Sequence, residues 1–217
     1  GRLDGAVNEF HDIFGFPDGP RGDRPEDLFE VSYQRDGQYL VNVARPQSGF
    51  GDMGVSLIYS LDKSWVQDLK VGSKLKVPTG NPSRLTGSGT HDIAFWLSAT
   101  NPLGNQFSHF LTLGGTLIEQ DRGLLSDMRN SGYGFLSYGV AWRYSPAIDL
   151  KIQLDTRSAI YKQTALLPLG SATTVSFGGV LRLSNNYILE IAIAEDIAVG
   201  TAPDVVFQFN VTRNSSF

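Results

Sequence analysis

The chain of 217 residues carries a formal net charge of −4, only 18% of its residues are charged, and it contains no cysteine. Lysine and arginine are scattered singly, which argues against a nucleic-acid-binding protein, and no disulfide framework or thiolate metal site can form. No apolar run approaches the ~20 residues that a membrane-spanning helix needs.

Apolar and polar residues alternate along most of the chain, which is the period of β-strands. A weak opening strand before residue 10 and the segments that follow it predict about twelve strands. In chain order these segments are 29–33, 39–43, 53–61, 65–77, 93–97, 107–117, 136–144, 148–157, 175–183, 187–194 and 204–212. The alternation is clearest over 148–157, where one face is entirely apolar and the other is polar and charged.

The connections between these segments alternate in length. Short turns are expected at 35–37, 61–64, 101–105, 145–147 and 183–186. Longer loops rich in Gly, Pro, Asn and Ser are expected at 46–51, 78–90, 119–132 and 161–172, with a shorter one at 196–202. Outer-membrane β-barrels have this rhythm, with tight turns at the periplasmic end and long loops outside the cell.

Aromatic residues of the apolar face gather beside the short turns. They are Tyr33, Tyr39, Tyr59, Trp65, Phe107, Trp142, Tyr144 and Tyr187. Such residues would form one girdle at a membrane interface. A soluble barrel with its apolar face inward shows the same alternation, but its rings would have no reason to cluster at one end. The polar face here is also rich in Gly, Ser, Thr and Ala.

The sequence therefore predicts an all-β fold: an antiparallel up-and-down transmembrane β-barrel of about twelve strands. Residues 1–217 are expected to form this single domain in a bacterial outer membrane, in contact with outer-membrane lipid.

If the apolar face meets lipid, the charged residues of the other face line the lumen. They are Glu30, Lys70, Lys74, Lys76, Asp92, Arg143, Asp149, Lys151, Asp155, Arg157, Arg182 and Glu190. Charges inside a barrel must be hydrated or paired, because an isolated ion in a dry core is too costly. Two interpretations stay open: a hydrated path whose charges tune selectivity, or a salt-bridged lumen that only maintains the barrel's shape.

A distinct apolar segment surrounds a His-Asp pair near the start of the chain. Its candidate mouth or plug residues are Phe10, His11, Asp12 and Phe14. The segment could enter the barrel mouth near a ligand, but a packing anchor that covers the barrel end is the favoured interpretation.

No catalytic, metal or cofactor site is predicted. Ser108 and His109 are adjacent on a strand and must point to opposite faces, so they cannot pair directly. The three histidines have no metal-ligand spacing. A lipid-modifying enzyme that uses His91 and Asp92 is the least favoured hypothesis.

Three blocks resemble one Gram-negative family, catalogued as domain of unknown function 3187. The blocks lie at 10–15, at 76–80 with 87–92, and at 195–196 with 201–207. The resemblance implies an outer-membrane barrel without an established activity. It also implies that this chain lacks a signal peptide and some N-terminal strands, so that the full-length barrel would have more strands.

The main functional hypothesis is a porin-like pore or transport path for a small solute. The alternative is a structural or interaction barrel with a plugged lumen, whose long loops bind a partner protein.

Overall fold

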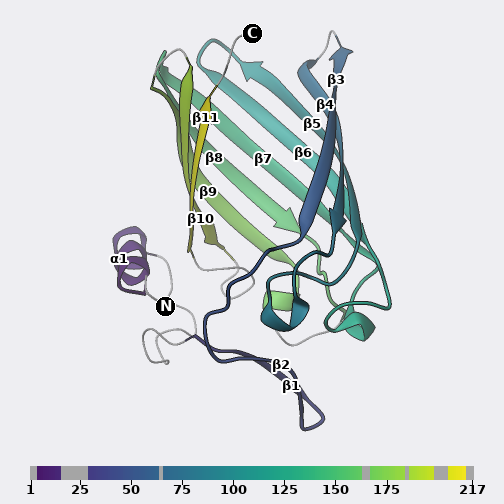
Figure 1. Cartoon of the computed structure of the whole chain (residues 1–217). Helices are drawn as coiled ribbons and strands as arrows, with labels where there is room; N and C mark the ends of the chain where they lie inside the picture. The colour runs from purple at the N-terminus through teal and green to yellow at the C-terminus, as the bar shows by residue number, and fades with distance from the viewer. Residues whose placement is uncertain are drawn as a thin grey trace.

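The computed structural model describes residues 4–15, 29–63, 66–162, 167–183, 186–197 and 205–213 (Figure 1). Nine strands form one antiparallel sheet in which each strand pairs with its neighbours in sequence. They are β3 (Met53–Lys63), β4 (Val66–Val77), β5 (Asp92–Leu103), β6 (Phe107–Ile118), β7 (Gly132–Ser145), β8 (Ile148–Arg157), β9 (Ala172–Arg182), β10 (Tyr187–Asp196) and β11 (Val205–Arg213). The predicted all-β, antiparallel up-and-down architecture is confirmed.

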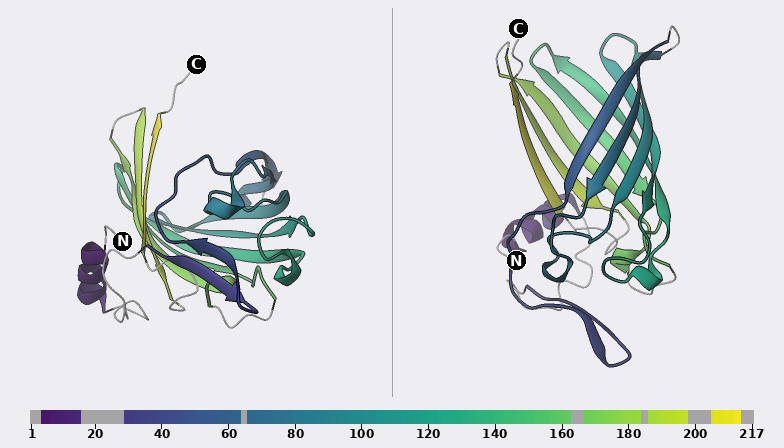
Figure 2. Two further views of the ribbon diagram at one scale, coloured as in Figure 1. Left: turned by 60° about the horizontal axis from the view of Figure 1, so that its bottom comes forward. Right: turned by 45° about the vertical axis from the view of Figure 1, so that its right-hand side comes forward.

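The sheet curves into a trough, with β3 and β11 at its two edges (Figures 1 and 2). No pairing joins these edges among the described residues, which hold eleven strands in all. The trough therefore accounts for the curved wall of a barrel, but not for its closure. The long loops at one end contain the short 3₁₀ helices η2 (Pro82–Arg84), η3 (Ser126–Met128) and η4 (Leu167–Leu169).

The two strands expected at 29–33 and 39–43 lie outside this wall. β1 (Val31–Arg35) and β2 (Gln38–Val43) pair only with each other, around an Asp36-Gly37 turn with positive φ at both residues. The hairpin lies at the long-loop end, where Arg35 Nη1 is 2.7 Å from Asp127 Oδ2. The hydrogen bond and the charge of Arg35 lower the pKa of Asp127. The prediction that Tyr33 and Tyr39 join the girdle at the short turns is therefore wrong.

The opening segment is a helix and not a weak strand. α1 (Asp4–Phe14) ends at Gly15, which has a φ of 71° and donates its N–H to the carbonyl of His11. Positions 7, 10 and 14 are apolar at helical spacing, which overrides the short local alternation. Among the described helices, none has the length and apolar character needed to cross a membrane.

α1 lies beside the convex side of the sheet near β10, outside the trough (Figures 1 and 2). His11 Nε2 is 3.3 Å from Glu195 Oε1, and both side chains are buried. Glu195 pairs in register with Val175 and Val205 and so belongs to the apolar face. Phe10 and His11 therefore do not plug the lumen, and Asp12 is exposed. The side chain of Phe14 and residues 16–24 lie outside the described residues.

The convex face of the sheet is apolar and exposed. Leu57, Tyr59 and Phe209 are each 70% exposed or more, whereas only six hydrophobic residues of the described part are buried. Of the residues predicted to form the girdle, the described wall members are all exposed on this face, and they are Tyr59, Phe107, Trp142, Tyr144 and Tyr187. Trp65 lies outside the described residues. The fold is thus apolar outside and polar inside, the reverse of a soluble barrel.

Candidate functional site

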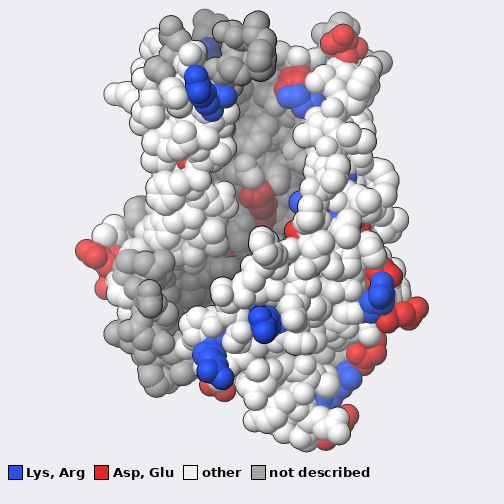
Figure 3. Space-filling model, viewed as in Figure 1, with Lys and Arg blue, Asp and Glu red and all other residues white. Residues whose placement is uncertain are grey.

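The concave face of the trough carries the predicted lumen charges, and Figure 3 looks into it between the two edges. Strand register assigns eleven of the twelve candidates to this face. These are Lys70, Lys74, Lys76, Asp92, Arg143, Asp149, Lys151, Asp155, Arg157, Arg182 and Glu190. The twelfth, Glu30, is wrong: it precedes the separate hairpin β1–β2 and has no place in the nine-stranded wall.

An ion-pair cluster lies on the concave face at the short-turn end. Arg182 Nη2 is 2.6 Å from Asp149 Oδ2, and Arg143 Nε is 3.7 Å from the other oxygen of the same carboxylate. The Asp149 side chain is largely buried by these partners. This cluster fits the interpretation in which lumen charges hold the wall together.

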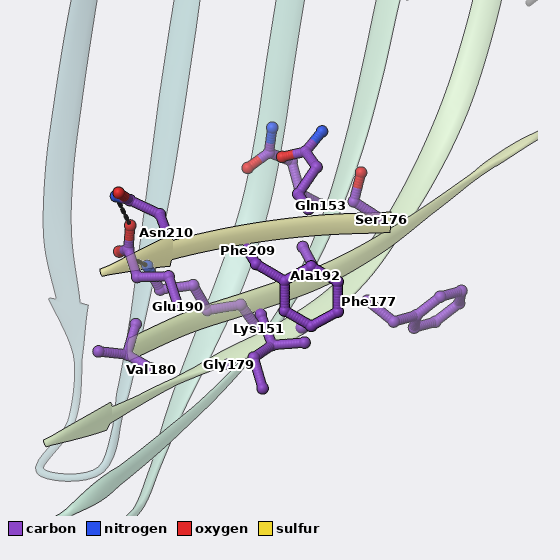
Figure 4. Close-up of a pocket in the computed structure, with 13 residues that line it drawn as sticks. Lys151, Gln153, Ser176, Phe177, Gly179, Val180, Glu190, Ala192, Phe209 and Asn210 are labelled. Carbon is purple, nitrogen blue, oxygen red and sulfur yellow. Dashed lines mark hydrogen bonds and ion pairs between the residues drawn. The ribbon is translucent and has the colours of Figure 1, made fainter. Parts of the chain in front are cut away.

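A polar groove of about 370 Å³ runs across β8 to β11 on the same face (Figure 4). Lys151 Nζ lies 4.0 Å from Glu190 Oε1, and Asn210 Nδ2 donates to Glu190 Oε2 at 3.0 Å. Gly178 and Ala192 form its floor, because neither has a side chain large enough to fill it. Nearby, Gln153 donates to both oxygens of Asp155.

A second polar cluster surrounds Lys76 at the long-loop end. Lys76 Nζ contacts Asp92, donates to Ser88 Oγ at 2.6 Å and lies 3.8 Å from Asp52. Thr90, which is buried, donates to Asp92 at 2.8 Å. The Lys76 cluster, made of Lys76, Asp52, Asp92, Ser88 and Thr90, folds the loop back onto the wall.

Asp52 is the charged residue of this cluster that the sequence analysis missed. It accepts hydrogen bonds from the backbone N–H of Gly80 at 3.0 Å and from the backbone and hydroxyl of Ser88 at 2.8 Å each. Burial alone would raise the pKa of Asp52, but these donors and Lys76 outweigh it and lower the pKa. Nothing in the sequence marks Asp52, because its partners follow it by about one strand and one loop.

Aromatic rings on the concave face were also missed. Trp96 follows Phe95 and precedes Leu97, so it breaks the alternation and points inward. Gly114 of β6 pairs with Trp96 of β5 on one side and with Phe135 of β7 on the other, so Phe135 also points inward. The signal in the sequence was the unbroken apolar run Phe95-Trp96-Leu97. The glycines that face Trp96, at positions 72 and 114, are identified only by strand register.

The residues considered for catalysis are not brought together. His91 Nδ1 lies 2.8 Å from Glu119, whose pKa is lowered chiefly by hydrogen bonds from the backbone and ring of His91. Asp92 binds Lys76 and Thr90 instead. His109 lies on the convex face with its ring 6.0 Å from that of Tyr138, whereas Ser108 is concave. The described residues contain no cluster of His, Asp and Glu able to hold a metal ion.

Fold and site together define a one-layer antiparallel wall with an apolar exterior and a charged interior. The chain belongs to the family described as "Protein of unknown function (DUF3187)", which its residues 1–214 match. The fold is similar to the crystal structure of the COG4313 outer membrane channel from Pseudomonas putida F1, with a TM-score of 0.61 and 18% identity. That likeness covers 85% of this chain and 72% of the channel. No curated protein matches the chain.

Proposed function

We propose that the protein is a bacterial outer-membrane channel whose lumen is a hydrated path for a small solute. The observation that carries this proposal is the division of the wall into an exposed apolar face and a charged concave face. Exposed apolar area of this extent is unfavourable in water and favourable in lipid. The likeness to an outer membrane channel supports the same location.

The geometry of the lumen also favours a path over a filled core. The described concave face has open grooves of about 370 and 520 Å³. α1, which includes the candidate mouth or plug residues, lies against the convex side. In this proposal residues 1–217 are one domain of the barrel.

Two measurements on the full-length protein test the proposal. Cell fractionation with a comparison of boiled and unboiled samples on a denaturing gel should give an outer-membrane protein that migrates differently once boiled. Purified protein in a planar bilayer should then give discrete conductance steps. A protein that is soluble without detergent overturns the location, and a folded membrane protein that never conducts overturns the path.

The hairpin β1–β2 favours the second function, a partner-binding role for the long-loop end. It projects beyond the trough in Figure 1, and its Tyr39 is 61% exposed. Deletion of residues 31–43 should then abolish a specific pull-down partner while conductance persists. If the same partner is recovered with the deletion variant, the hairpin does not recruit it.

A further inference from the structure

One row of residues crosses the concave face from β3 to β8. Its members are consecutive partners in the strand pairings: Ile58, Gly72, Trp96, Gly114, Phe135 and Arg157. These six positions alternate large apolar side chains with glycine and then reach the guanidinium of Arg157, which pairs onward with the small Ala172 of β9. We call these six residues the aromatic row. The adjacent row toward the short turns is polar throughout, from Lys70 through Ser98, Thr112 and Ser137 to Asp155.

The two glycines allow the rings to lie against the wall. A β-carbon at Gly72 would stand 2.0 Å from Trp96 Cε2, and one at Gly114 would stand 2.6 Å from Phe135 Cζ. Each ring therefore covers the backbone of the neighbouring strand instead of projecting into the lumen. The result is a flat apolar strip on a face that is otherwise polar, and both rings stay partly exposed.

Arg157 at the end of the strip has few partners. One of its guanidinium nitrogens, Nη1, donates to the carbonyl of Gly170 at 2.7 Å. Among the described residues, no carboxylate lies within salt-bridge distance of it. Asp155, two residues away on the same face, is instead bound by Gln153 and Ser137. A guanidinium has five N–H donors, so most of those of Arg157 remain available to an acceptor in the lumen.

There is room for a ligand at the junction of ring and cation. A groove of about 330 Å³ is lined by Phe135, Arg157 and Asp155, among others. The carboxylate of Asp155 already accepts hydrogen bonds from Gln153 and Ser137. Neighbouring strands are about 4.8 Å apart, and each ring leans away from Arg157 onto the glycine of the preceding strand. Along the row, the ring of Phe135 is therefore about 10 Å from the backbone of Arg157 and that of Trp96 about 19 Å, so only Phe135 is within reach of a small ligand that Arg157 holds. A molecule with a charged end and an apolar body of several carbons matches this spacing.

We propose that the Arg157 end of the aromatic row is a binding site for small amphipathic carboxylates, with the carboxylate on Arg157 and the apolar body on Phe135. Arginine matches a carboxylate through paired N–H donors, and flat rings bury planar or alkyl groups. The inference rests on the proposed channel function and names the solute class of the path. A purely structural role, in which the rings cover glycines of the sheet, would account for Trp96 and Phe135. It would not account for the cation of Arg157 beside Phe135.

Calorimetry on the detergent-solubilised full-length protein tests the site directly. The probes are phenylbutyrate, butyrate, which has only the charged end, and phenylbutanol, which has only the apolar body. Phenylbutyrate should bind at least about tenfold more tightly than either, because charged hydrogen bonds and ring contacts both contribute. Arg157→Gln should weaken phenylbutyrate about tenfold and leave phenylbutanol unchanged, and Phe135→Leu should weaken phenylbutyrate about threefold or more.

Two matched variants control for charge and ring content. Arg143→Gln removes an equal charge at the short-turn end, and Phe110→Leu removes an inward ring that covers Gly139 two rows away. Both should bind phenylbutyrate within about twofold of the parent. If Arg157→Gln fails to fold, Arg157→Lys replaces it as the test variant, because it keeps the positive charge. It should still weaken binding, because an ammonium lacks the paired N–H donors of a guanidinium.

Equal binding of butyrate and phenylbutyrate, or undiminished binding by Arg157→Gln, would overturn the proposal. Bilayer recordings separate this failure from failure of the channel. A conducting protein that is not blocked by phenylbutyrate and does not bind it lacks the site but keeps the path. A protein that binds phenylbutyrate through Arg157 yet never conducts keeps the site and loses the path.

Discussion

Trp96 and Gly72 are in direct contact across β5 and β4. They are register partners, and a β-carbon on Gly72 would stand 2.0 Å from Cε2 of the indole. Real β-carbons do not come this close to another heavy atom, so the ring and a larger residue at position 72 exclude each other. The position of Trp96 over the wall therefore depends on the absence of a side chain one strand away.

Gly72→Ala should destabilise the folded wall by about 1–3 kcal/mol, because the bulky indole must leave its rotamer or the strands must separate. The measurement is the temperature at which the fast-migrating folded band disappears on a gel of unboiled samples. Gly134→Ala is the matched control, since its nearest contact would be an ordinary 3.8 Å. Equal melting of the two variants would mean that the ring does not rest on Gly72.

Lys76→Met should loosen the loop between β4 and β5. Lys76 is bound between Asp52 and Asp92, so its loss leaves two carboxylates near each other without their shared cation. We expect the loop at 78–91 to be cleaved at least about tenfold faster by a protease, because each 1.4 kcal/mol of lost stability raises the open population tenfold.

The control for that prediction is Lys74→Met. Lys74 points to the same face from the same strand, and the described residues give it no carboxylate partner. It should leave the cleavage rate unchanged. Faster cleavage of both variants alike would assign the effect to net lumen charge and not to the Lys76 cluster.

Acid should open the same loop through Asp52. Its folded pKa is lowered, so its contribution to stability is complete above the ordinary carboxyl pKa and is lost as the pH falls through the lowered folded value. Loop cleavage by an acid-active protease should therefore rise as the pH drops below about 4. In Asp52→Asn, cleavage should be faster at neutral pH and should rise less on acidification. A parallel rise in both proteins would assign the acid response to other carboxylates.

Much of the wall was predictable because the alternation of apolar and polar residues is a local property of each strand and can be recognised without knowing which strands pair. The alternation at 148–157 assigned Asp149, Lys151, Asp155 and Arg157 to one face, and register confirms it. The sequence of the hairpin β1–β2 fits wall strands equally well, because an alternating pattern predicts a strand but does not specify which strand it pairs with. Its placement depends on Arg35 and Asp127, which are far apart in sequence.

The opening helix and the concave site depend on information that a linear pattern lacks. Residues 4–14 are too few for strand and helix periods to be separated reliably. The partners of Asp52 and the glycines beneath Trp96 and Phe135 become neighbours only through strand register. The charges of the lumen could therefore be named from the sequence, whereas the row that ends at Arg157 could not.

Adjacent residues of β8 provide the sharpest test of which face meets lipid. Ile152 lies on the convex face, is 47% exposed and sits near the middle of its strand, whereas Gln153 lies on the concave face beside Asp155. Ile152→Arg should cost about 2–4 kcal/mol if that face is in the bilayer core, and assembly into the outer membrane should fall accordingly. Gln153→Arg adds the same charge in the lumen, where Asp155 can pair with it, and should assemble like the parent. The comparison measures the amount of folded, boiling-sensitive protein in the outer-membrane fraction. If Ile152→Arg assembled as well as Gln153→Arg, the apolar convex face would not be in contact with lipid, and the channel proposal would lose its basis.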